Sequence, residues 1–232
     1  LLNAILGRAQ RACCAEVAEA MGSGQGGAAD LEARFVAMFR AEWAAERGNA
    51  PLRHVAIVDE APQGQYLLPE FLLFQRLFEH HGIAASICDP TELSHGPQGL
   101  SLQGRPVDLV YNRLTDFAFD APASAALRDA WLAGSAVITP HPRAHALYAD
   151  KRNLVLLSSP DALRGLGADE ASIALIQAGV PRTEAVSRDR ADDFWARRRG
   201  LFFKPASGFG SRGAYRGDKL TRRVFDEIIA GD

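Results

Sequence analysis

Residues 201–213, LFFKPASGFGSRG, combine the side chains and the backbone freedom that bind phosphate groups. An apolar run ends in Lys204, and Pro205 then removes the amide that a continuing strand would need. Glycines let backbone N–H groups approach phosphate oxygens, and serine hydroxyls and a guanidinium add further donors. The candidate donors after Lys204 are Ser207, Gly208, Gly210, Ser211, Arg212 and Gly213. The lysine precedes the glycines, so this is not the P-loop pattern GxxxxGK[ST].

A second lysine, Lys151, lies earlier in the chain in YADKRNLVLL, within an expected helix over 142–159. A second helix is expected over 169–181, ending in the turn AGVP, and a short strand over 183–187. A helix over 192–200 and a β-loop-β hairpin over 201–217 follow. The glycine-rich hairpin alone would also fit a mobile surface loop with solvated charges. Its position after Lys151 and the AGVP turn favours phosphate binding.

The region before these elements has the pattern of a parallel α/β sheet. Short apolar strands are expected at 54–60, 82–89, 107–114 and 135–140, with one helix between the first two strands and another between the last two. Strands that alternate with helices indicate parallel strands joined by right-handed crossovers. We therefore divide the chain into an N-terminal helical segment (1–50, with a glycine-rich break at 22–27), an α/β domain (51–140) and a second domain (141–232).

Polar residues end two of the expected strands, where ligands of parallel α/β sheets bind. Asp59 and Glu60 end the first strand, and Asn112 and Arg113 end the third. Arg113 could hold a substrate carboxylate with two parallel hydrogen bonds, and Asn112 could orient it. Local capping, with Arg113 paired to Asp116, is an equally good interpretation.

The segment HPRAHA at 141–146 contains a further candidate, Arg143, for a contact with substrate or phosphate. His141 and His145 have the i, i+4 spacing of metal ligands. Pro142 is expected to begin the helix after His141, and no third ligand is nearby, so we predict no metal site.

Composition restricts the classes of partner. A net charge of −2 and a pI of about 6.3 give no overall attraction to nucleic acid or to an anionic membrane. No apolar run approaches the roughly 20 residues of a membrane span, and no secretory signal is recognisable, so we expect a cytoplasmic protein. Basic residues do gather between 197 and 223, which leaves nucleic-acid binding as an alternative.

The order of Lys151, the AGVP turn, the strand ending in Lys204 and the glycine-rich loop resembles the ATP-grasp superfamily, ligases that include bacterial glutathione synthetase and D-alanine:D-alanine ligase. The resemblance is most specific over residues 135–217, and the preceding α/β region is similar to the pre-ATP-grasp domain. It implies that Lys151 contacts the α-phosphate of ATP and that Lys204 reaches the α- and β-phosphates. It also implies that residues 206–213 close over the triphosphate, with Arg212 as the candidate catalytic cation.

The implied reaction joins a carboxylate to an amine through an acyl phosphate, with ATP and Mg²⁺ as cofactors. The residues that hold Mg²⁺ in this family are expected beyond residue 232, so residues 141–232 would form the first part of the nucleotide fold. A homodimer is compatible with the sequence. A protein that kept the fold and binds nucleotide or nucleic acid without catalysis is the alternative.

Overall fold

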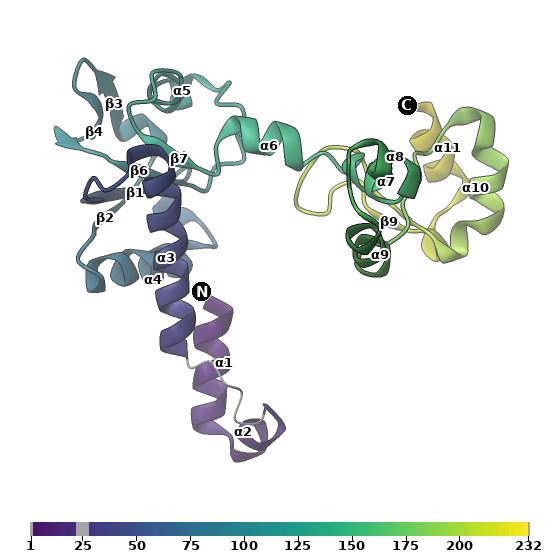
Figure 1. The fold of residues 1–232 in the computed structure, drawn as a ribbon, viewed down its shortest axis with the longest axis horizontal. Coiled ribbons are helices and arrows are strands. Elements are labelled where there is room, and N and C mark those ends of the chain that lie inside the picture. The colour runs from purple at the N-terminus through teal and green to yellow at the C-terminus, as the bar shows by residue number, and fades with distance from the viewer. Residues whose placement is uncertain (1, 22–27, 232) are drawn as a thin grey trace. The chain divides into compact units, whose positions relative to one another are not determined.

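The computed structural model describes residues 2–21 and 28–231, so the expected break at 22–27 lies outside the described residues. The chain forms two compact units, Leu1–Pro142 and Arg143–Asp232 (Figure 1). None of the helices in the described parts of the chain is long and apolar enough to cross a membrane.

A four-stranded parallel sheet forms the centre of the first unit, in the order β2-β1-β6-β7. The strands are β1 (His54–Val58), β2 (Ala84–Cys88), β6 (Leu109–Asn112) and β7 (Val137–Thr139). All residues of β1 are buried, as a central strand covered on both faces requires. The prediction of a parallel α/β sheet is therefore confirmed, and the four strands lie where they were expected.

Different elements cover the two faces of this sheet. Residues of α3 (Ala28–Arg47) and α4 (Leu68–His80) pack on one face around Phe39, Phe74 and Phe78. On the other face lie α5 (Ala125–Leu132) and an antiparallel meander of β3 (Leu93–Gly96), β4 (Gly99–Leu102) and β5 (Arg105–Pro106). Figure 1 shows α4 on one side of the strands and α5 with the meander on the other. The N-terminal segment also contains α1 (Leu2–Cys13) and α2 (Ala15–Met21).

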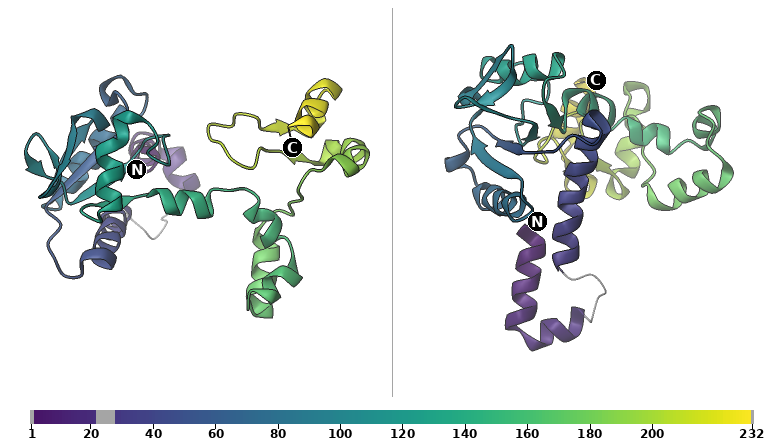
Figure 2. Two further views of the ribbon diagram at one scale, coloured as in Figure 1. Left: turned by 90° about the horizontal axis from the view of Figure 1, so that it is seen from above. Right: turned by 60° about the vertical axis from the view of Figure 1, so that its left-hand side comes forward.

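The second unit consists of short helices and one hairpin. Its helices are α6 (Pro142–Tyr148, which begins at the unit boundary), α7 (Asn153–Leu157), α8 (Pro160–Gly165), α9 (Glu170–Gly179), α10 (Ala191–Arg197) and α11 (Arg222–Ala230). The predicted hairpin is present, with β8 (Phe202–Phe203) antiparallel to β9 (Tyr215–Arg216) and a long loop between them (Figure 2). A small core of Phe194, Phe203, Leu220 and Phe225 holds α10, α11 and the hairpin together.

Two sequence predictions for this unit were wrong. The helix expected over 142–159 is interrupted between Tyr148 and Asn153. The Asp150 carboxylate accepts the Arg152 amide at 2.8 Å, and the Asn153 side chain donates to the Leu147 carbonyl at 2.7 Å. These local bonds compete with helical ones.

The residues of the strand expected over 183–187 form no strand. The Glu184 carboxylate anchors it, accepting from Arg197 at 2.8 Å and from Arg190 at 2.9 Å. These two guanidinium groups lower the pKa of Glu184 to about 2. An ion-pair cluster thus holds in place the segment that was expected to form a strand.

Candidate phosphate-binding site

The loop between β8 and β9 contains glycines with positive φ angles. Gly208 and Gly213 have positive φ angles of 114° and 69°, in the region that favours glycine. A Cβ atom at Gly213 would also lie 3.4 Å from the Pro205 ring. The glycines therefore allow the chain to turn back over Pro205, directly after Lys204.

Lys151 is attached to this loop by two hydrogen bonds. Its backbone N–H donates to the Ala206 carbonyl at 2.8 Å, and its Nζ donates to the Gly208 carbonyl at 3.2 Å. Lys151 occupies the turn between α6 and α7, because the expected helix is interrupted there. This interruption, which was not predicted, places Lys151 beside the glycines.

Lys151, Lys204 and the loop enclose a hollow of about 220 Å³. Its lining consists of Lys151, Lys204, Pro205, Gly208, Phe209, Gly210, Ser211, Arg212 and Ala214. Three side chains in this set are cationic and none is acidic. A hollow with this lining attracts an anion.

The three cations of the hollow are available to a ligand. Lys204 lies over the Phe202 ring, with Nζ 5.4 Å from the ring centroid, and Arg212 lies over the Phe209 ring at 5.7 Å. None of the three forms an ion pair with a carboxylate of the described residues. An incoming anion therefore displaces no protein carboxylate from them.

Some of the other predicted donors line the hollow and some do not. Gly208, Gly210 and Ser211 line the hollow, whereas Ser207 and Gly213 lie in the same loop outside the lining. Sequence reasoning missed Pro205, Phe209 and Ala214. An aromatic residue inside a glycine-rich loop was the available signal for Phe209.

The two substrate candidates of the first unit, Asn112 and Arg113, differ in their hydrogen-bond partners. Asn112 Nδ2 donates to the Pro140 carbonyl at 3.2 Å, and its Oδ1 accepts the Leu114 amide at 3.1 Å, so it ties two strand ends together. The alternative pairing of Arg113 with Asp116 does not occur among the described residues. The Asp116 carboxylate instead accepts backbone amides of the turn that follows it, at 3.0 and 3.1 Å.

Arg143 lies exposed in the first turn of α6, at the start of the second unit. The residues of the described ranges contain no group of three or more histidine, cysteine, aspartate or glutamate side chains placed to hold a metal ion.

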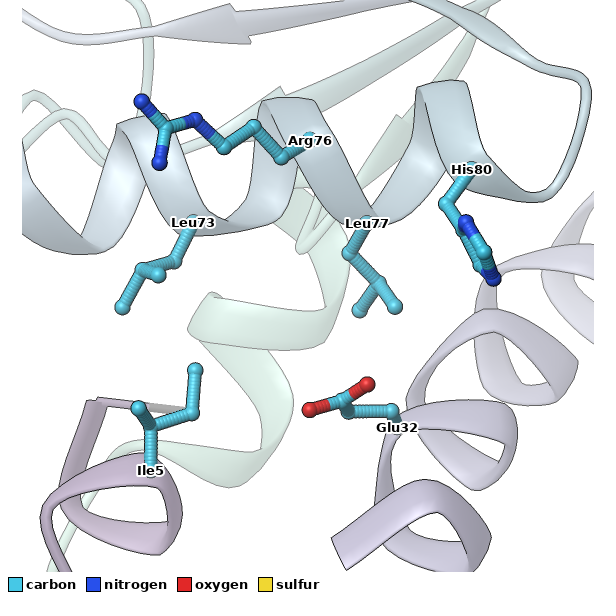
Figure 3. A pocket seen from close by; sticks show the side chains of 6 residues that line it. All are labelled: Ile5, Glu32, Leu73, Arg76, Leu77 and His80. Carbon is cyan, nitrogen blue, oxygen red and sulfur yellow. The ribbon is translucent and has the colours of Figure 1, made fainter. Parts of the chain in front are cut away.

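A second hollow, of about 160 Å³, lies between α1, α3 and α4 (Figure 3). Leu73 and Leu77 of α4 point towards Ile5 and Glu32, and the Arg76 side chain is directed away from them. Its lining mixes apolar groups with single charges of both signs. We assign no ligand to it.

Comparison of the chain with known protein families and with curated proteins gave no match.

Proposed function

We propose that the chain binds the phosphates of ATP in the hollow between Lys151 and the β8–β9 loop, as part of an ATP-dependent carboxylate–amine ligase of the ATP-grasp type. The observation that carries the proposal is the convergence of Lys151, Lys204 and Arg212, all without an ion-pair partner among the described residues, on one hollow lined by glycines. Residues 51–140 would be the pre-ATP-grasp domain and residues 141–232 the first part of the nucleotide fold.

The residues present fit a polyphosphate. Two lysines can neutralise neighbouring phosphates, and loop amides and the Ser211 hydroxyl can donate to their oxygens. The described lining contains no carboxylate, so we assign no magnesium ligand to this hollow.

When bound, ATP would supply the phosphoryl group that activates a carboxylate for attack by an amine. Lys151 and Lys204 would bind and orient the phosphates, and Arg212 would stabilise the charge that develops during transfer. The loop over 206–213 would exclude water from the transferring group.

Ion pairs within the basic segment favour this function over nucleic-acid binding. The pairs are Arg197–Glu184, Arg216–Asp218, Arg222–Asp226 and Arg223–Glu227. Carboxylates therefore pair with four of the basic residues between 197 and 223, whereas Lys151, Lys204 and Arg212 form no ion pair with a described carboxylate.

Titration calorimetry of the chain with ATP tests the proposal. We expect Lys204→Ala to weaken binding about 10- to 100-fold, because one hydrogen bond to a charged group contributes about 1.5–3 kcal/mol. Lys219→Ala is the matched control, since Lys219 is exposed in the same unit and does not line the hollow. Equal ATP affinity in the Lys204→Ala variant and the unaltered chain would contradict the proposal.

A further inference from the structure

We propose that the first unit contains a second binding site, for a small α-amino acid, in which Arg113 and Tyr111 hold the carboxylate and Asp59 receives the ammonium group. The site lies at the carboxyl ends of β1 and β6. The assignment of this amino acid as the amine substrate rests on the proposed ligase function. Amino-acid binding itself can be measured without nucleotide.

Strand pairing places the three residues at the ends of two adjacent strands. Val58 and Asn112 are partners in the parallel pair β1–β6, and the Arg113 amide donates to the Val58 carbonyl at 2.9 Å. Asp59 and Arg113, the residues that follow these partners, therefore lie next to each other at the ends of adjacent strands. Tyr111 precedes Arg113 by two residues, so both side chains lie on the face that α4 covers.

The guanidinium group of Arg113 lies beside two aromatic rings and forms no ion pair with a carboxylate of the described residues. Its Cζ lies 5.4 Å from the centroid of Tyr111 and 5.9 Å from that of Phe71. Nη1 donates to the Tyr111 hydroxyl at 3.2 Å, whereas Nε is shielded from solvent and has no hydrogen-bond partner. A guanidinium has five N–H groups, and no described carboxylate pairs with this one. Because leaving such donors unsatisfied is costly, the arrangement favours a bound anion.

Tyr111 adds a neutral donor beside this cation. Its hydroxyl oxygen accepts from Arg113, which leaves the hydroxyl hydrogen free to donate. Burial is the main cause of its raised pKa, so the phenol stays protonated at neutral pH. A carboxylate could accept from the guanidinium with one oxygen and from the phenol with the other.

Acidic groups near this pair favour a zwitterion over a simple anion. Asp59 is only 8% exposed, and its Oδ1 accepts the Glu60 amide at 2.9 Å. Burial raises the pKa of Asp59, while the positive charge of Arg113 acts in the opposite direction. The charge of Glu70, in the first turn of α4, contributes to the raised pKa of Tyr111. Two carboxylates close to the site would repel a phosphate or a dicarboxylate, whereas an ammonium group would be attracted.

Saturation-transfer NMR on the methyl signal of L-alanine, with the full chain and no nucleotide, tests this site. We expect saturable binding of alanine, weakened at least about 10-fold by Arg113→Gln and several-fold by Tyr111→Phe, since each removes a donor to the carboxylate. Tyr111→Phe removes a single hydroxyl, so it remains informative if Arg113→Gln does not fold. Arg76→Gln, at an exposed arginine of α4, should leave alanine binding unchanged.

Three outcomes would overturn the inference: no transfer to alanine at concentrations up to about 50 mM, equal alanine affinity in the Arg113→Gln and Tyr111→Phe variants and the unaltered chain, or acetate binding as tightly as alanine. Failure here is separable from failure of the nucleotide proposal. The Lys204→Ala variant should bind alanine normally, and Arg113→Gln should bind ATP normally.

Discussion

Replacing Gly217 by alanine is expected to destabilise the second unit by about 3 kcal/mol or more, at the upper end of the cost of overpacking. A Cβ atom at Gly217 would overlap the Arg198 carbonyl oxygen and would lie 2.9 Å from that of Leu201. Both neighbours are backbone atoms, and the Gly217 amide itself donates to the Leu201 carbonyl at 2.9 Å. Relieving the clash requires backbone atoms to move beside this bond, which holds the segment after β9 against the segment before β8.

Hydrogen exchange measured by mass spectrometry in peptides of α11 would detect the change, with protection falling by roughly 100-fold if exchange follows local opening. Gly200→Ala is the matched control. Gly200 belongs to the neighbouring 3₁₀ turn, and nothing lies within 4 Å of a Cβ atom there. An α11 equally protected in Gly217→Ala and Gly200→Ala would contradict the packing described for this segment.

The double variant Lys151→Ala/Lys204→Ala is expected to lower ATP affinity by about 100-fold or more, because it removes two of the three cations of the hollow. The variant removes the bond from Lys151 Nζ to the Gly208 carbonyl, but the backbone bond from Lys151 to Ala206 does not need the side chain and should keep the loop attached. The loss would then report on charge rather than on loop position.

Single and double variants compared by calorimetry would form a cycle between the two lysines. Because both lie in one hollow, we expect their effects to be coupled rather than additive. Circular dichroism that matches the unaltered chain is the control for folding. ATP affinity that falls by less than threefold in the double variant would count against this hollow as the phosphate site.

The sheet could be predicted from the sequence because its strands are apolar runs bounded by polar residues. The HVAIV run of β1 is fully buried, so both packing and composition favour a strand. The meander β3–β5 was missed because its strands are short and rich in serine, glycine and histidine. Only the alternating burial of Leu100 and Leu102 marks β4, and two leucines are too few to be distinctive.

The sequence predicted which residues belong to the candidate site better than it predicted how they are arranged. Lys204 and the glycine-rich loop were identified from composition and order. The position of Lys151 depends on side-chain hydrogen bonds of Asp150 and Asn153 that interrupt a helix. The spacing of apolar residues, from which the helix was predicted, carries no information about such bonds. Arg113 does not pair with Asp116 because the Asp116 carboxylate accepts the Asp120 amide instead. The spacing of residues in the sequence does not specify this choice.

NMR of the chain labelled with ¹³C at lysine Cε tests phosphate binding at the hollow most directly, because the sequence contains only three lysines. On addition of ATP, we predict that the signals of Lys151 and Lys204 shift together with one affinity and that the signal of Lys219 stays in place. If no lysine signal moves, or if Lys219 moves as much as the other two, ATP does not bind in the hollow and the proposed function is wrong.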